Sequence, residues 1–286
     1  MQNAMPPKKI QAFMALSIIA TCFCSCSTYR YIYTASPPNN PYFTKKHESK
    51  LTAYYAASNN NQGNEIYAGG IDLQAAYALS NHWAITGTYF NSREKDDYGG
   101  QDNSPFDSSA VKYKRNLFET AVGYFVPLDK NIMFNLYAGV GLGKFSIDDN
   151  GTISAGTNYS RYHNSNITKW FLQPAINFIP QKNIRFSLIL KSSFVHFGNI
   201  TTSYTDYELQ YFKLDRFSNR TIFFMEPALN LQLGLQKYPW VKLDWMIAGV
   251  SKNAYTEYNV RQNNIAIGLS FDFSKITKKT HDKYSE

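Results

Sequence analysis

The sequence predicts an all-β protein that folds as an antiparallel, up-and-down transmembrane β-barrel of about ten strands. Three observations lead to this prediction. Apolar and polar residues alternate from about residue 50 to residue 273, the connections between these segments are short and long in turn, and aromatic residues lie near the segment ends. Strict alternation is typical of strands that have one apolar and one polar face.

The alternation is clearest in the segment IAIGLSFDF, where Ile265, Ile267, Leu269, Phe271 and Phe273 share one face. Tyr, Phe, Asn, Ser and Thr are abundant in the whole chain, and the aromatic and β-branched residues among them favour strands. Ten segments follow the pattern, near residues 50–58, 67–79, 82–91, 115–126, 131–146, 167–179, 184–197, 220–235, 240–251 and 264–273.

The connections between these segments sort by length. The tight turns are 80–82, 127–131, 180–183 and 237–239, and the longer polar connections are 59–66, 92–114, 147–166, 198–219 and 252–263. Transmembrane barrels have short periplasmic turns and long extracellular loops, whereas a soluble sandwich with Greek-key crossings has no reason to sort its loops in this way. Because an even number of strands brings both barrel ends beside short turns, both termini are predicted to be periplasmic.

Aromatic residues on the apolar face are spaced as two girdles require. Trp83 and Tyr89, for example, share a face near opposite ends of one segment. Pairs of this kind span roughly 15–25 Å at about 3.3 Å per residue and a tilt of about 40°. The outward apolar band of a transmembrane barrel is about 25 Å tall, so the spacing favours a membrane environment.

One internal repeat is visible. The segments WFLQPAINF (170–178) and FFMEPALNL (223–231) match position for position, which is typical of duplicated hairpins in an up-and-down barrel. Each segment contains a proline, Pro174 or Pro227, and proline removes a hydrogen bond from the ladder. We therefore expect a bulge at each proline.

The N-terminal region has the pattern of an export signal. The basic start MQNAMPPKK precedes an apolar run of about fourteen residues, which is too short to span a membrane as a helix but fits a signal-peptide core. The chain has three cysteines, Cys22, Cys24 and Cys26, all at the end of this run. Clustered cysteines with no distant partner form no disulfide framework, and three thiols without a fourth ligand make no structural zinc site.

The cysteine stretch resembles a bacterial lipoprotein signal, in which the cysteine after a small residue becomes the lipidated N-terminus. The resemblance implies lipidation of Cys26, which follows Ser25, with Cys22 as the alternative and an unlipidated chain as a third outcome. Consecutive prolines after the cysteines predict a semi-extended tether. The expected organisation is a signal peptide at 1–25, a lipid-anchored, proline-containing tether at 26–49, the barrel at 50–273 and a polar tail at 274–286.

Residues 50–273 resemble the small outer-membrane β-barrels of Gram-negative bacteria, specifically those with a lipoprotein-type leader. The leader, the alternating strands and a last strand that ends in an aromatic residue carry this resemblance. It implies a location in the bacterial outer membrane, with the lipid of Cys26 in the inner leaflet beside the first strand. The implied partners are outer-membrane lipid, the barrel-insertion machinery and the lipoprotein-processing machinery.

If the apolar face points to lipid, the residues of opposite parity face the lumen. The polar residues of this face are Asp72, Gln74, Glu119, Asn135, Gln173, Asn177, Arg185, Lys191, Glu226, Asn230, Lys242, Asp244 and Asp272. About eight strands give a barrel that side chains just fill, and ten strands give one slightly wider. Because buried charges must pair, Glu119 and Glu226 are expected to meet Arg185, Lys191 or Lys242. A mostly filled lumen is predicted, and a narrow small-solute channel is the alternative.

The sequence offers no catalytic constellation, so we predict that the protein is not an enzyme. No histidine is placed in the lumen beside a serine and an acid. An outer-membrane enzyme remains an alternative through His196 with Asp206, Glu208 or Asp215 in the loop that follows. The stretch SIDDNGT (146–152) lacks the ligand spacing of a calcium loop, and we expect no metal and no cofactor.

The long connections are the remaining candidates for function. Residues 91–110 and 201–219 mix Tyr, Phe, Asp and Arg, which suits contact with an extracellular glycan or protein. The net charge of +8 is scattered without a concentrated basic stripe, so nucleic acid is excluded as a partner. The predicted role is therefore structural or surface-binding, and a lipid-tethered soluble periplasmic β-protein is a further alternative.

Overall fold

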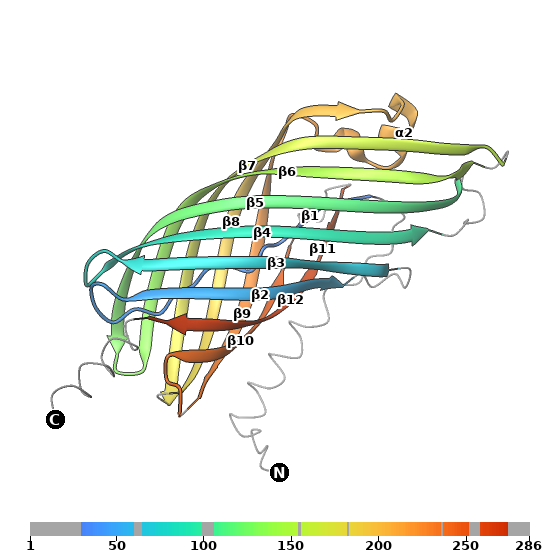
Figure 1. The fold of residues 1–286 in the computed structure, drawn as a ribbon. Helices are drawn as coiled ribbons and strands as arrows, with labels where there is room; N and C mark the ends of the chain where they lie inside the picture. The colour runs from blue at the N-terminus through green and yellow to red at the C-terminus, as the bar shows by residue number, and fades with distance from the viewer. Residues whose placement is uncertain are drawn as a thin grey trace, which may run out of the picture.

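A computed structural model shows a closed antiparallel barrel of ten strands in the order β10-β12-β2-β3-β4-β5-β6-β7-β8-β9 (Figure 1). The structure describes residues 30–59, 65–98, 106–153, 156–181, 183–235, 237–251 and 258–273. Each strand pairs with its neighbour in sequence, and β12 closes the barrel on β2. The predicted fold class and strand number are confirmed.

The wall of the barrel is uneven in height. Its strands are β2 (Ser49–Asn59), β3 (Glu65–Ala78), β4 (Trp83–Tyr98), β5 (Phe106–Asp129), β6 (Ile132–Ile153), β7 (Asn158–Gln181), β8 (Ile184–Thr202), β9 (Thr221–Gly234), β10 (Val241–Gly249) and β12 (Asn263–Asp272). Strands β5 and β7 have 24 residues, whereas β10 has 9. The expected loops 92–114 and 147–166 are therefore mostly strand, because their polar residues continue the same in-register pairing above the apolar belt.

The outer face of the barrel is apolar. Ile267 is 56% exposed and Leu269 is 47% exposed, while the alternate residues Gly268 and Ser270 are buried. Trp83 and Tyr89 are also exposed on this face. A continuous apolar belt on a closed sheet suits hydrocarbon and not water, so the barrel spans a membrane. Among the described residues, no helix has the length and apolar character needed to cross one.

The prediction of a bulge at each of the two prolines is wrong. Pro174 pairs in register with Leu136 of β6, and the pairing of β7 with β8 keeps one register on both sides of it. Pro227 pairs in register with Leu190 of β8, and pairing with β10 begins one residue later. A strand residue turns its N–H toward one neighbour only, so proline interrupts one ladder and leaves the other intact.

The predicted tether is not outside the barrel. Residues 30–43, here called the strap, cross the lumen, and β1 (Tyr31–Thr34) pairs in parallel with β11 (Asn259–Arg261) inside the wall (Figure 1). The side chains of Ile32 and Tyr33 are 0% and 2% exposed. Residues 26–29 of the predicted tether lie outside the described residues.

The connection between β8 and β9 also folds inward. It contains α2 (Asp206–Tyr211) and the 3-10 helix η1 (Leu214–Arg216). Phe217, which is fully buried, lies 5.0 Å from the ring of Phe197 and 5.4 Å from the ring of His163. This connection therefore packs on the lumen face of the tall part of the wall.

Candidate functional site

The lumen and the strap inside it form the candidate site. Contacts with β5 show the direction of the strap. Strand β5 runs from the long-loop end at Phe106 to the short-turn end at Asp129. The ring of Phe43 lies 5.9 Å from that of Phe125, close to the short turn. Arg30, at the other end of the strap, donates to Ser109 at 3.0 Å. The strap therefore spans the lumen from one end to the other.

The part of the strap near the short turns is held by neutral hydrogen bonds. The side-chain amides of Gln74, Gln173 and Asn135 each donate to a backbone carbonyl of the strap at 2.9–3.0 Å. The acceptors are the carbonyl oxygens of Pro37, Asn39 and Pro41, in that order. A buried carbonyl needs a partner, and proline has no N–H to satisfy. This explains why a proline-rich segment fits a polar lumen.

Four charged side chains form an ion cluster at mid-height. Lys169 lies 3.1 Å from Glu119 and 3.0 Å from Glu226, and Lys191 lies 2.6 Å from Glu119. The strap joins this cluster, because the Tyr33 hydroxyl donates to Glu226 at 3.0 Å and accepts from Lys169 at 2.7 Å. All five side chains are buried, and the two positive and two negative charges balance as burial requires.

Glu119, Lys191 and Glu226 were predicted to be lumen residues, whereas Lys169 was not. Lys169 has the lumen parity of β7, with Phe171 and Gln173, so strand parity alone could have identified it. The contact with Tyr33 had no signal of this kind. It joins residues 136 positions apart, and residue 33 was predicted to lie outside the barrel.

A second charged group lies above the ion cluster, where the strap pairs with β11. Arg261 reaches both oxygens of Asp96 at 2.7 and 2.8 Å and also pairs with Glu94. Glu94 pairs with Arg115, whose guanidinium donates to the carbonyl of Tyr31 at 3.0 Å. This upper group was not predicted, because residues 92–114 and 252–263 were expected to be loops.

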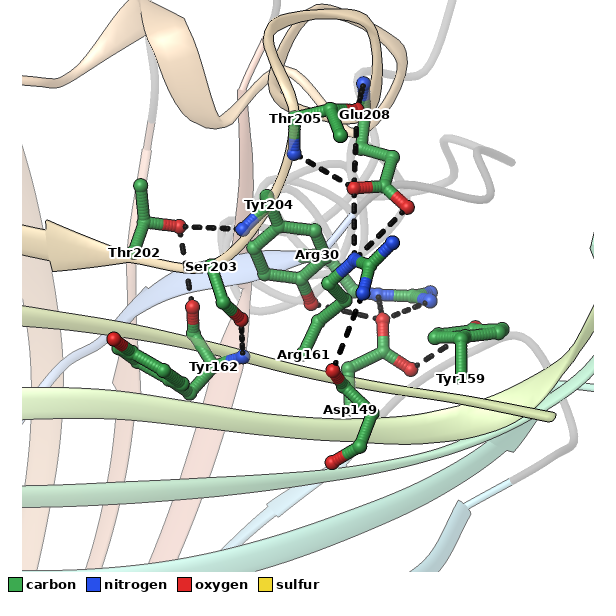
Figure 2. A network of polar contacts seen from close by, with 11 residues as sticks. Arg30, Asp149, Tyr159, Arg161, Tyr162, Thr202, Ser203, Tyr204, Thr205 and Glu208 are labelled. Atoms are coloured by element: carbon green, nitrogen blue, oxygen red, sulfur yellow. Dashed lines mark hydrogen bonds and ion pairs between the residues drawn. The ribbon is translucent and has the colours of Figure 1, made fainter.

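Arg30 anchors the outermost end of the strap (Figure 2). Its guanidinium lies 2.7 Å from Asp149, and the two side chains are 2% and 0% exposed. The hydroxyl of Tyr204 donates to the same carboxylate at 2.8 Å. The ring of Phe212 lies 4.0 Å from the guanidinium carbon of Arg30. The connection between β8 and β9 thus covers the residue at which the described chain begins.

Glu208 fixes that connection in place. It accepts two hydrogen bonds from Arg161 at 3.0 and 3.1 Å, and it forms a capping box with Thr205 at the start of α2 (Figure 2). Burial opposes ionisation of Glu208, but the hydrogen bonds from Arg161 and Thr205 outweigh it and lower the pKa of the carboxyl group. The carboxylate is therefore ionised at neutral pH.

The structure places every predicted polar lumen residue in the interior of the barrel; these residues are Asp72, Gln74, Glu119, Asn135, Gln173, Asn177, Arg185, Lys191, Glu226, Asn230, Lys242, Asp244 and Asp272. The expected partners differ for two of them. Lys242 pairs with Asp272, and Arg185 lies 4.0 Å from the ring of Tyr42. Both are near the short-turn end, too far down their strands to reach the mid-height cluster.

The possible catalytic residues lie on β8 and in the connection that follows it. His196 makes a contact of 3.3 Å with Thr221, and within the described residues no hydrogen bond or ion pair joins it to Asp206, Glu208 or Asp215. Among the same residues, no group of three or more His, Cys, Asp or Glu side chains is placed to hold a metal ion. Cys22 and Cys26 lie outside the described part of the chain.

These features define a closed transmembrane β-barrel whose lumen holds its own N-terminal segment. No protein-family model and no curated protein sequence matches the chain. Among solved structures, it is similar to the attachment invasion locus protein Ail of Yersinia pestis, with 13% identity, a TM-score of 0.30, and coverage of 79% of this chain and 99% of that one.

Two further solved structures are also similar to the chain. The outer membrane protease OmpT from Escherichia coli is 11% identical with a TM-score of 0.38, and the match covers 79% of this chain and 94% of that one. The translocator domain of the autotransporter NalP from Neisseria meningitidis is 8% identical with a TM-score of 0.45, and the match covers 92% of this chain and 94% of that one. At these identities and scores, the likenesses carry no inference about ligand or activity.

Proposed function

We propose that this protein is an outer-membrane barrel of a Gram-negative bacterium that is closed to solutes and acts as a structural or surface-binding protein. The apolar belt supports a membrane location, and the short turns at one end with long connections at the other support the orientation. The belt argues against the alternative of a soluble periplasmic β-protein tethered by lipid. Lipidation of Cys26, or of Cys22, stays part of the proposal.

The occupied lumen is the observation that supports a closed barrel. From Ile32 to Ser36, every strap side chain is at most 4% exposed. Amide hydrogen bonds hold the strap below this stretch, the ion cluster holds it at mid-height, and Arg30 holds it above. A conducting pathway needs a continuous column of water, and the strap occupies the axis along which that column would run.

The long-loop end supports a binding role. Tyr207 is 63% exposed, and its ring lies 6.2 Å from that of Tyr211 on the same short helix. Tyr162 is also exposed at this end. Exposed aromatic rings beside Arg161 and other hydrogen-bonding groups suit contact with a glycan or a protein. Outer-membrane lipid and the machineries that insert the barrel and process the leader complete the proposed partners.

Single-channel recording in planar bilayers tests the closed state. The unmodified protein is expected to show no steady conductance, whereas a variant that lacks residues 31–43 is expected to conduct. Heat-modifiable mobility on a gel checks that the shortened chain still forms a closed barrel. Steady conductance of the unmodified protein would support the narrow small-solute channel and refute the closed state. Release of the full chain from membranes by carbonate would refute the membrane location.

A further inference from the structure

The strap has one direction through the lumen. After the strap, the N–H of His47 donates to the carbonyl of Ala78 at 2.9 Å, beside the short turn between β3 and β4. At its other end, Arg30 pairs with Asp149, which lies near the end of β6 at Ile153. The chain therefore leaves the long-loop end, descends through the lumen, and enters β2 from the short-turn end.

The length of the strap agrees with a full crossing. A segment of this size extends about 43 Å at about 3.3 Å per residue. The part of β5 from Phe125 to Ser109, which lies beside the strap, rises about 40 Å at a tilt of about 40°. The apolar band of a membrane barrel is only about 25 Å tall. Arg30 is consequently beyond the band on the long-loop side.

The two ends of the described chain lie on opposite sides of the barrel. Phe273 donates to the carbonyl of Ser49 at 3.1 Å, at the short-turn end, while Arg30 is at the long-loop end. Both termini had been expected at the short-turn end, because the first barrel strand begins there. That expectation did not include a segment that returns through the lumen.

We infer that the chain N-terminal to Arg30 emerges at the cell surface and not in the periplasm. The inference rests on the proposed outer-membrane location. Cys26 is four residues before Arg30 and at most about 14 Å of chain away, and Cys22 is at most about 29 Å away. Neither distance allows a return of about 40 Å through the barrel. An acyl chain on either cysteine is therefore presented on the outer side, not in the inner leaflet.

The Arg30–Asp149 pair stabilises the strap in this orientation. Both side chains are buried, and Tyr204 and Tyr159 donate to the same carboxylate at 2.8 and 3.2 Å. Withdrawal of the strap toward the short turns would leave Asp149 without its cation, and an unpaired buried charge is strongly destabilising. Arg30 would also have to pass the ion cluster, which already has balanced charges.

Epitope accessibility on intact cells tests the inference. One epitope is inserted between Ser27 and Thr28, a surface control is inserted after Gly100 in the long β4–β5 connection, and a periplasmic control after Lys237 in the short β9–β10 turn. Heat-modifiable mobility of each protein shows that the barrel has formed before antibody is added. The epitope at residue 27 is expected to bind antibody on intact cells as strongly as the one at Gly100.

Binding at residue 27 only after permeabilisation, as expected for Lys237, would overturn the inference. If the epitope prevents barrel formation, a site for a sequence-specific protease at the same position replaces it. Protease added outside intact cells should then cut the chain, and complete resistance there, with cleavage after permeabilisation, would overturn the inference. The closed lumen and the direction of the strap are tested separately. A barrel that does not conduct, but whose residue 27 is inaccessible on intact cells, would leave the closed lumen intact and refute only the direction of the strap.

Discussion

The two halves of the strap are held by different kinds of contact. The half near the short turns, residues 37–43, is held by neutral amide hydrogen bonds to its carbonyls and by packing of Phe43 on Phe125. The half near the long loops, residues 30–34 and here called the upper half, is held by the buried Arg30–Asp149 ion pair, by hydrogen bonds to buried charged side chains and by pairing with β11. The lower half, residues 37–43, is therefore held by contacts that do not depend on charge, whereas the contacts of the upper half do.

The physical chemistry of the two halves predicts different responses. A neutral hydrogen bond contributes about 1 kcal/mol and does not depend on salt or on pH near neutrality. Removal of one partner from a buried ion pair costs about 3–5 kcal/mol, because the other charge is left in a medium of low dielectric constant. Substitutions in the upper half should therefore release the strap more readily than substitutions in the lower half.

The largest effect is expected for Glu94→Ala. Glu94 accepts hydrogen bonds from both Arg115 and Arg261, so its loss leaves two buried cations with incomplete pairing. We expect a loss of about 3–5 kcal/mol in the free energy of unfolding, measured by urea titration in detergent. The matched control is Lys114→Ala, which breaks an exposed pair with Asp148 and should cost under about 1 kcal/mol. Equal costs for the two variants would contradict the comparison.

Lys169→Met should have the next largest effect. The substitution keeps much of the side-chain volume but removes the cation shared by Glu119 and Glu226. Lys191 still neutralises Glu119, so we expect a smaller loss of about 3 kcal/mol and faster hydrogen exchange at Tyr33. Tyr33→Phe removes only the hydroxyl and should cost about 1–2 kcal/mol. A Lys169→Met protein as stable as the parent would show that the ion cluster does not hold the strap.

Asn135→Ala tests the lower half. The variant leaves the carbonyl of Pro41 without its donor and removes the contact between Asn135 and Asn40. The expected loss is about 1–2 kcal/mol, the same in low and high salt, because no charge is involved. Urea titrations at two salt concentrations measure it. A strong salt dependence would mean that the lower half is not the neutral anchor described above.

The smallest effect concerns Glu208 and pH. Because the folded state lowers the pKa of Glu208, its stabilisation is present at neutral pH and is lost as the pH falls through the lowered folded pKa. The contribution should be below about 1 kcal/mol, since Arg161 is partly exposed. The protection factors of the Leu209 and Phe212 amides, which correct for the pH dependence of intrinsic exchange, should fall on acidification, and Glu208→Gln should abolish that dependence. Identical pH profiles for the two proteins would exclude this role.

Much of the barrel could be predicted from the sequence, because strand parity is a local signal. Alternation in IAIGLSFDF places Ile267 outward, and the same rule places Lys191 and Glu119 inward. Parity also applies to Glu94 and Asp149, but the polar outer parts of the strands have no apolar face to reveal it.

The path of the strap could not be predicted in this way. Its partners are distributed over many strands, and Arg30 and Asp149 are 119 positions apart. Pro37, Pro38 and the neighbouring asparagines have the composition of an exposed tether. They are equally suited to a polar lumen that supplies an amide donor to the Pro37 carbonyl and a carbonyl acceptor to the Asn39 side chain. Composition does not distinguish solvent from a polar interior, so only the tertiary structure shows where this segment lies.

Photo-cross-linking from position 33 tests the central claim most directly. A photoreactive aromatic amino acid replaces Tyr33, whose ring stacks on Phe224 at 4.4 Å, and the intact membrane-embedded barrel is irradiated and mapped by mass spectrometry. The lumen-filling strap predicts intramolecular cross-links to β7 and β9, around Lys169 and Phe224. Absence of any cross-link within the barrel, with products formed only to lipid or to other proteins, would contradict it.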